Sequence, residues 1–319
     1  MLLLDDDGCI IRSDAVVARI IGLVAADATI AAAATDVALD SQRWGSSALH
    51  FSARARDSGA AALLKVNVAA GQLWWTRALA QERPELLPEV YASGEDLGGE
   101  ALGWVLWERV AGGLHSGWRG REFDILLDAG VQFQRASRTL ASRALAAGAI
   151  AELRLADLAV PIERGVSRAA PGPAEHVLAR LAADWTWVND VCEREVCHGD
   201  LHMANALCRD GPPDGVALLI DHHPTRMPWA WEPAKPEILN ADSARLGCRN
   251  LIARQAEVRA RLGLSAPAGP DLARLQAIVL GWWAIQLWGS IGPSPDPQWR
   301  SPAVWRAENE AYIAAAARA

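Results

Sequence analysis

Residues 196–208 read Val-Cys-His-Gly-Asp-Leu-His-Met-Ala-Asn-Ala-Leu-Cys, and a second short apolar segment, residues 216–220, runs into Asp221. A first short apolar segment, residues 195–197, leads to Asp200, and Asn205 follows five residues later. Mg²⁺ prefers oxygen ligands, often a carboxylate together with an amide oxygen. Phosphoryl transfer needs such a metal bridge and also an acceptor beside the attacking hydroxyl, which an Asp can supply. The spacing of these residues therefore indicates phosphoryl-transfer chemistry.

The same residues form a recognisable signature. Residues 198–205, His-Gly-Asp-Leu-His-x-x-Asn, followed by Ile220-Asp221, resemble the signature of the aminoglycoside phosphotransferase and choline kinase superfamily. That resemblance implies a protein-kinase-like fold, with Asp200 as the catalytic base and with Asn205 and Asp221 as metal ligands. It also implies ATP or GTP and Mg²⁺ as cofactors, and a small hydroxylated molecule as substrate.

Lysine is rare in this chain. Of its 31 lysines and arginines only two are lysines, Lys65 and Lys235. The chain thus uses arginine as its ordinary surface cation, and a lysine inside an apolar run calls for a reason. Lys65 stands in the apolar run 60–68, where the resembled family places its phosphate-binding lysine, and residues 104–112 resemble the last N-lobe strand and the hinge. The further expected nucleotide-binding residues are Gly45, Ser46, Ser47, Glu108 and Val110.

Two features depart from the family pattern. A helix carboxylate that would pair with Lys65 is not evident, because Gln72 stands near the expected position and Glu82 comes too late. After Asp221, the usual Gly-Asp and Asp-Leu-Ala pattern is replaced by a segment rich in His, Pro and Trp, residues 222–232. The acceptor side of the site is therefore left open by the motif.

Hydrophobic periodicity and turn signals predict an α+β, bilobal, kinase-like fold. An N-lobe, residues 1–112, is expected to contain a helical preface and a small antiparallel sheet, and a mainly helical C-lobe, residues 113–319, to follow. The predicted N-lobe elements are a helix at 14–34, strands at 47–55, 60–68 and 103–110, and a helix at 72–81. The predicted early C-lobe elements are helices at 119–147 and about 174–190, joined by a Pro- and Gly-containing link at 161–173.

Composition bounds the partners and the compartment. The formal charge of −7 supplies no basic footprint for nucleic acid. No apolar stretch reaches the roughly 18 residues of a membrane span, and the start of the chain lacks the pattern of a secretory signal. Five cysteines form no CxxC pair, which fits a reducing cytoplasm. The oligomeric state is left open.

Three alternatives stay open at this point. The stretch 2–13 is similar to the first motif of haloacid-dehalogenase-like phosphatases, with Asp5 as nucleophile and Asp7 as acid and base, although an acidic turn explains it as well. A zinc site could use His198, His202 and one of the two following histidines at 222 and 223. A nucleotide-binding pseudokinase is the third alternative, because the helix carboxylate is missing.

The acceptor is predicted to be an amino sugar of the aminoglycoside type, with a neutral sugar or a choline-like alcohol as the alternative. Carboxylates after the motif, among them Glu232 and Glu237, would attract ammonium groups if they stood on a cleft wall. Trp229 and Trp231 offer faces for sugar rings or cations.

Overall fold

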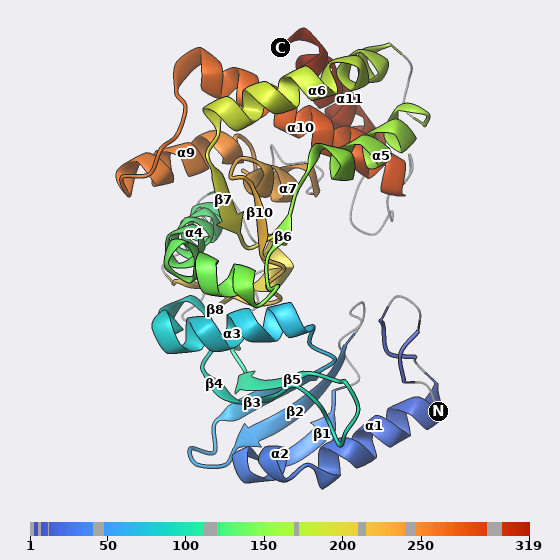
Figure 1. The fold of residues 1–319 in the computed structure, drawn as a ribbon, viewed down its shortest axis with the longest axis vertical. Helices are drawn as coiled ribbons and strands as arrows, with labels where there is room; N and C mark the ends of the chain where they lie inside the picture. The colour runs from blue at the N-terminus through green and yellow to red at the C-terminus, as the bar shows by residue number, and fades with distance from the viewer. Residues whose placement is uncertain are drawn as a thin grey trace. The chain divides into compact units, whose positions relative to one another are not determined.

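The computed structural model describes residues 3–5, 8–11, 13–40, 48–111, 120, 122–168, 172–209, 215–239, 247–291 and 302–319. The chain divides into two compact units, and Figure 1 draws the elements of each. Unit 1 comprises Met1–Ala111, Ser142–Ala149 and Leu218–His222. Unit 2 comprises Gly112–Ala141, Ile150–Ala217 and His223–Ala319.

Unit 1 is built on a five-stranded antiparallel sheet with the strand order β1-β2-β3-β5-β4. The strands are β1 (Ala34–Leu39), β2 (Leu49–Ala55), β3 (Ala61–Val66), β4 (Val90–Gly94) and β5 (Trp104–Glu108). β3 is central and buried along nearly its whole length, which is why it reads as a continuous apolar run. This sheet confirms the predicted antiparallel N-lobe sheet.

The sequence pattern missed β1 and β4 for physical reasons. All residues of β4 are half-buried, so the strand shows no alternation of apolar and polar residues. β1 contains an irregularity in its pairing between Thr35 and Ala38, where Asp36 has a φ of 54°. A bulge of this kind breaks the period of two that identifies a strand.

Three helices belong to unit 1. The helix predicted at 14–34 is two helices, α1 (Asp14–Ala26) and α2 (Ala28–Ala33), because Asp27 is extended and its carboxylate caps α2 by accepting a hydrogen bond from the Ile30 amide at 2.9 Å. α3 (Ala70–Glu82) begins close to the predicted helix 72–81 and is followed by a short 3₁₀ turn, Pro84–Leu86.

Unit 2 is mainly helical, as predicted. Its helices are α5 (Leu155–Val166), α6 (Pro173–Val191), α7 (Trp231–Leu239), α9 (Leu251–Arg261), α10 (Gly269–Ile291) and α11 (Pro302–Arg318), and α4 (Glu122–Ala146) begins in it. The link predicted at 161–173 is wrong in its first part, because Pro161 lies inside α5. A core of apolar side chains joins these helices, with Trp229, Trp282 and Trp305 among its fully buried members.

A short sheet in unit 2 positions the motif. Its strands β6 (Ala151–Glu152), β10 (Thr225–Pro228) and β7 (Arg194–Cys197) lie in the order β6-β10-β7. β10 runs antiparallel to β7, with Thr225 opposite Cys197. The motif leaves the end of β7, passes through the 3₁₀ turn Met203–Asn205 and enters β8 (Ala206–Cys208); β9 (Ala217–Leu219) then leads to Asp221.

Two further observations concern the predicted compartment. No helix among the described residues is long and apolar enough to cross a membrane. All five cysteines are free thiols.

Candidate active site

The loop after β7 is shaped by Gly199 and His198. Gly199 has a φ of 86°, and a Cβ at this position would lie 1.7 Å from the carbonyl oxygen of His223, so only glycine fits here. His198 is fully buried, and its Nδ1 accepts a hydrogen bond from the Asp200 amide at 3.3 Å. Its ring lies edge-on to Phe133, with the centroids 5.7 Å apart. His198 therefore organises the backbone that carries Asp200.

The carboxylate of Asp200 is contacted on both oxygens. Asn205 Nδ2 donates to Asp200 Oδ2 at 2.8 Å and to the Asp200 carbonyl oxygen at 3.1 Å. His202 Nε2 lies 3.4 Å from Oδ2, and the ammonium of Lys235 pairs with Oδ1. The structure thus brings Asp200 and Asn205 together, as their spacing predicted, and adds Lys235, for which the motif offered no signal.

Helix α7 contributes two side chains to this loop. Glu232 Oε1 accepts a hydrogen bond from the Gly199 amide at 2.8 Å, and Lys235 contacts the next loop residue, Asp200. Burial raises the pKa of the Glu232 carboxyl to about 7, although the Gly199 amide favours the charged form. Burial also lowers the pKa of the Lys235 ammonium to about 8. Both groups can therefore titrate close to neutral pH.

In unit 1, Lys65 and Asp221 form an ion pair. Lys65 is buried in the central strand β3, and Gln72 Nε2 on α3 donates to the same carboxylate oxygen at 3.0 Å. Burial by itself raises the pKa of Asp221, but the charge and the hydrogen bonds of Lys65 and Gln72 outweigh it and hold that pKa below its ordinary value. Asp221 also has a φ of 57°, a left-handed conformation uncommon outside glycine.

This arrangement clarifies the first departure from the family pattern. Lys65 and Gln72, which lies on α3, both contact Oδ1 of Asp221. Glu82, at the end of α3, pairs with Arg143. Within the described residues, the carboxylate that pairs with Lys65 is thus Asp221 rather than one on α3.

The other expected nucleotide contacts have mixed outcomes. Gly45, Ser46 and Ser47 lie outside the described residues. Glu108 ends β5, where its Oε2 accepts a hydrogen bond from the Glu89 amide at 3.3 Å. Val110 follows two residues later and is buried. Their contact with an adenine ring stays a prediction.

The residues expected to attract an amino sugar are buried. Trp229 and Trp231 belong to the core of unit 2, and Glu232 and Glu237 are each less than 5% exposed. Glu237 accepts hydrogen bonds from the Leu251 amide, at 2.8 Å, and from a tyrosine hydroxyl. These four side chains therefore hold the fold of unit 2, and the condition that Glu232 and Glu237 stand on a cleft wall is not met.

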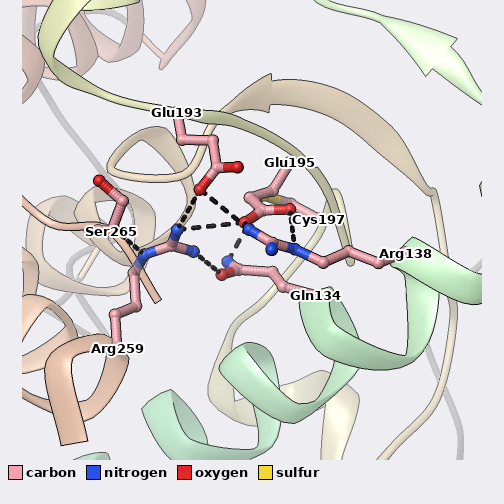
Figure 2. Close-up of polar contacts among 7 residues, drawn as sticks. All are labelled: Gln134, Arg138, Glu193, Glu195, Cys197, Arg259 and Ser265. Atoms are coloured by element: carbon pink, nitrogen blue, oxygen red, sulfur yellow. Dashed lines mark hydrogen bonds and ion pairs between the residues drawn. The ribbon is translucent and has the colours of Figure 1, made fainter. Parts of the chain in front are cut away.

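A cluster of arginines and glutamates braces β7, the strand that delivers the loop (Figure 2). Arg259 is fully buried; its guanidinium donates to Gln134 at 2.6 Å, to Glu193 at 3.2 Å and to Glu195 at 3.1 Å. Arg138 pairs with the same two glutamates. Such planar, forked contacts fix a strand in place. This cluster was missed by sequence reasoning, since its members lie far apart in the chain.

The phosphatase and zinc alternatives gain no support. Asp5 lies in a tight turn, where its Oδ1 accepts a hydrogen bond from the Cys9 amide at 2.8 Å, and Asp7 lies outside the described residues. Within the described part of the chain, no three His, Cys, Asp or Glu side chains gather as metal ligands do. His202, one of the expected zinc ligands, accepts a hydrogen bond from the Ala204 amide at 3.2 Å.

Comparison with known proteins identifies the family. A model of the phosphotransferase enzyme family matches residues 27–221. This match covers more than half of the chain, so the protein belongs to that family. No sequence among curated proteins matches. The protein is therefore an enzyme, a small-molecule phosphotransferase of the kinase type, as the motif predicted.

Solved structures show the same fold at low sequence identity. An amicoumacin kinase in complex with AMP-PNP, Ca²⁺ and Ami has a TM-score of 0.55 and 12% identity, and the match covers 88% of each chain. A spectinomycin phosphotransferase in its AMP complex has a TM-score of 0.54 and 9% identity, over 93% of each chain. An aminoglycoside phosphotransferase from Alicyclobacillus acidocaldarius has a TM-score of 0.51 and 15% identity, over 90% of this chain and 92% of the other. The α+β, protein-kinase-like fold is thus confirmed.

Proposed function

We propose that this enzyme transfers the γ-phosphate of ATP or GTP to a hydroxyl of a small molecule. In this proposal residues 1–112 act as the N-lobe and residues 113–319 as the C-lobe. The observation that carries it is the pair in the loop after β7: the Asp200 carboxylate is held by the Asn205 amide at 2.8 Å. Asp200 orients the attacking hydroxyl and accepts its proton late in the reaction.

The donor set suits magnesium. Asn205 turns its amide nitrogen toward Asp200, which leaves the amide oxygen for a metal ion. Asp221 carries a carboxylate whose lowered pKa keeps it ionised at neutral pH. An amide oxygen and a carboxylate, completed by phosphate oxygens and water, are what Mg²⁺ takes at nucleotide sites. When bound there, Mg²⁺ would offset the negative charge of the phosphates.

Lys65 is proposed to bind the nucleotide phosphates. Its ammonium has three donors, so it can contact phosphate oxygens while it stays close to Asp221. The pairing of Lys65 with Asp221 keeps both side chains in place before nucleotide binds. Glu108 and Val110 at the end of β5, together with Gly45, Ser46 and Ser47, stay the proposed contacts for the rest of the nucleotide.

The acceptor is proposed as a hydroxylated small molecule, with amino sugars as the first class to test. Spectinomycin phosphotransferase and other aminoglycoside phosphotransferases share this fold, and so does a phosphotransferase solved with hygromycin B. The buried Trp229, Trp231, Glu232 and Glu237 no longer contribute to that choice. Neutral sugars and choline-like alcohols are therefore tested beside amino sugars.

The test is a phosphate-transfer screen with ATP and GTP against amino sugars, neutral sugars and amino alcohols. Each reaction is run with Mg²⁺, with EDTA, and with EDTA followed by excess Mg²⁺. We expect transfer to at least one acceptor, its loss in EDTA, and its recovery on addition of Mg²⁺. Full activity without a divalent metal would contradict the assignment of Asn205 and Asp221 as metal ligands.

The pseudokinase alternative is not retained. Gln72 stands where the family pattern expects a carboxylate for Lys65, but the chain belongs to a family of phosphotransferase enzymes.

A further inference from the structure

Both lysines of this chain contact a carboxylate of the proposed site. Lys65 pairs with Asp221, and Lys235 pairs with Asp200, although all but two of the 31 lysines and arginines are arginines. The proposed function uses Lys65 and leaves Lys235 without a role. A lysine ammonium is a compact charge with rotatable donors, and it loses its proton when buried far more readily than a guanidinium does. The use of lysine at both carboxylates therefore points to chemistry rather than to surface charge.

Helix α7 holds Lys235 in a fixed place. Of its nine residues, all but Lys235 and Leu239 are buried. The Trp231 carbonyl oxygen accepts a hydrogen bond from Trp283 Nε1 at 2.9 Å, and Glu237 Oε2 accepts one from the Leu251 amide at 2.8 Å. Because the helix is anchored at both ends, the ammonium of Lys235 is presented to Asp200 by a rigid element.

One face of α7 contacts two consecutive residues of the loop. Glu232 and Lys235 are three residues apart, a spacing that places both on the same side of a helix. Glu232 accepts the hydrogen bond of the Gly199 amide, and Lys235 pairs with the Asp200 carboxylate. A single turn of helix thereby fixes both the backbone and the side-chain orientation of the proposed base.

The charged groups around Lys235 come from the loop and from its own helix. Asp200 pairs with Lys235 from the loop, His202 lies against the other oxygen of Asp200, and Glu232 and Glu237 share the helix of Lys235. With a pKa of about 8 the ammonium is charged at pH 7, so the pair of Lys235 and Asp200 has no net charge. Asp200 then offers little attraction to a second cation, and an ammonium group close to the reacting hydroxyl would meet the like charge of Lys235.

We propose that Lys235 is a positioning residue for Asp200 and the built-in cation that selects acceptors without an ammonium group beside the reacting hydroxyl. This inference rests on the proposed function, and it refines the acceptor class from amino sugars toward neutral or anionic hydroxyl compounds. It assigns Lys235 a role that the sequence motif does not contain.

The first test needs no substrate. Protein labelled with ¹³C at the lysine Cε gives two side-chain NMR signals, because the chain has two lysines, and Lys235→Arg identifies the one that belongs to Lys235. We expect that signal to titrate near pH 8, and its midpoint to fall in Asp200→Asn, where the neighbouring negative charge is gone. Arg249→Met, which removes an ion pair with Glu308 elsewhere in unit 2, is the control and should leave the midpoint unchanged. If the titration midpoint of the Lys235 signal is the same in Asp200→Asn as in wild type, the proposal is overturned.

The second test compares a neutral sugar with its amino analogue as acceptors. Lys235→Met removes the charge at similar length, and we expect kcat for the neutral sugar to fall about 10-fold while KM for nucleotide changes little, since about 1.4 kcal/mol corresponds to a factor of ten. The kcat/KM ratio should shift toward the amino sugar by a similar factor. Lys235→Arg should keep the wild-type ratio. We expect wild-type kcat to fall as the pH rises above about 8, where Lys235 loses its charge, and Lys235→Arg to keep its kcat to higher pH because arginine stays protonated.

The outcomes separate this inference from the proposed function. If Lys235→Met leaves kcat and the acceptor ratio unchanged while Asp200→Asn is inactive, the role of Lys235 is wrong and the kinase mechanism stands. If wild type prefers the amino sugar, the selection of acceptors is wrong. If Asp200→Asn retains wild-type turnover, the proposed function itself fails. Should Lys235→Met not fold, Lys235→Gln and the NMR titration of the wild-type protein decide the question.

Discussion

Two groups of charged side chains in unit 2 lie next to each other along the chain but use different cations. At β7, Arg138 holds Glu195 through a forked contact, and Arg259 Nη2 donates to both Glu193 and Glu195 (Figure 2). In the loop that follows, a single lysine ammonium holds Asp200. The arginine cluster is suited to permanent contacts, because a guanidinium stays protonated and binds carboxylates with two parallel donors.

The ion pair of Lys235 with Asp200 is suited to an exchange of partners. An ammonium can rotate its donors between partners and can give up its charge when buried. The carboxylate of Asp200 must exchange partners if it is to receive a substrate hydroxyl. If Asp200 is the catalytic base, as proposed, arginine holds the carboxylates that stay in place and lysine holds the carboxylate that reacts.

The largest expected effect is on stability, in the arginine cluster. Arg259→Met leaves the buried Glu195 with Arg138 as its remaining cation and removes the ring contact of Arg259 with Trp229, whose centroid lies 5.0 Å away. We expect the free energy of unfolding to fall by about 3–5 kcal/mol, the scale of breaking a buried ion pair, as measured by urea denaturation.

The matched control is Arg249→Met, the same substitution in a more exposed pair, which should cost about 1 kcal/mol or less. Arg259→Lys should recover only part of the loss, because an ammonium cannot reproduce the forked contacts. If Arg259→Met is as stable as wild type, Arg138 alone is enough to stabilise the buried Glu195. The contrast between the arginine cluster and the Lys235–Asp200 pair would then disappear.

The next effect is on catalysis, in the loop. Asp200→Asn should lower turnover by roughly 10²-fold or more, the scale of a lost general base. Its melting temperature should change little, because the carboxylate is partly exposed and contributes weakly to stability. Steady-state kinetics and thermal melts of the same preparation measure both. Near-native turnover would remove Asp200 from the mechanism.

The third effect is a pH dependence of stability that comes from Glu232. Because burial raises the pKa of Glu232 from 4.5 to about 7, the folded protein binds more protons than the unfolded chain between these two values. Stability therefore falls as the pH rises through about 4.5 to 7. Glu232→Gln keeps an acceptor for the Gly199 amide and removes this titration.

We expect the stability of Glu232→Gln relative to wild type to rise by on the order of 2 kcal/mol between pH 4.5 and pH 8. Urea denaturation at several pH values across this range measures the difference. If the difference between the two proteins stays constant with pH, Glu232 is already ionised in the folded protein and its pKa is not raised.

The smallest expected effect is at the lysine of unit 1. Lys65→Ala should weaken nucleotide binding about 10-fold, equivalent to 1.4 kcal/mol, with little change in the stability of the nucleotide-free protein, because Gln72 still contacts Asp221. Lys65→Arg should not restore affinity fully, since a wide guanidinium fits phosphates differently from an ammonium. Nucleotide titration by calorimetry measures the change. A large loss of stability without nucleotide would instead assign Lys65 to the fold.

The sequence predicted those features of the fold and of the site that depend on residues close together in the chain. The contact between Asp200 and Asn205 spans five residues, and the strand that carries Lys65 is a continuous apolar run. Prediction failed where the signal was ambiguous: Asp27 divides one expected helix into two, and Pro161 lies within a helix rather than in a link. Local patterns also gave no measure of burial: Trp229, which was considered as a face for a sugar ring or a cation, belongs to the core.

By itself, then, the sequence determined the family, the kinase-like fold and the loop that carries Asp200, because these depend on residue types at short, fixed spacings. Only the tertiary structure decided which cation meets each carboxylate. Lys235 reaches Asp200 from 35 residues away, and Arg259 reaches Glu195 from 64 residues away. A hydrogen bond acts over about 3 Å, so its partners are chosen by how the helices pack. The scarcity of lysine drew attention to Lys65 in its apolar run, but the contact of Lys235 with Asp200 depends on the packing of α7 against the loop.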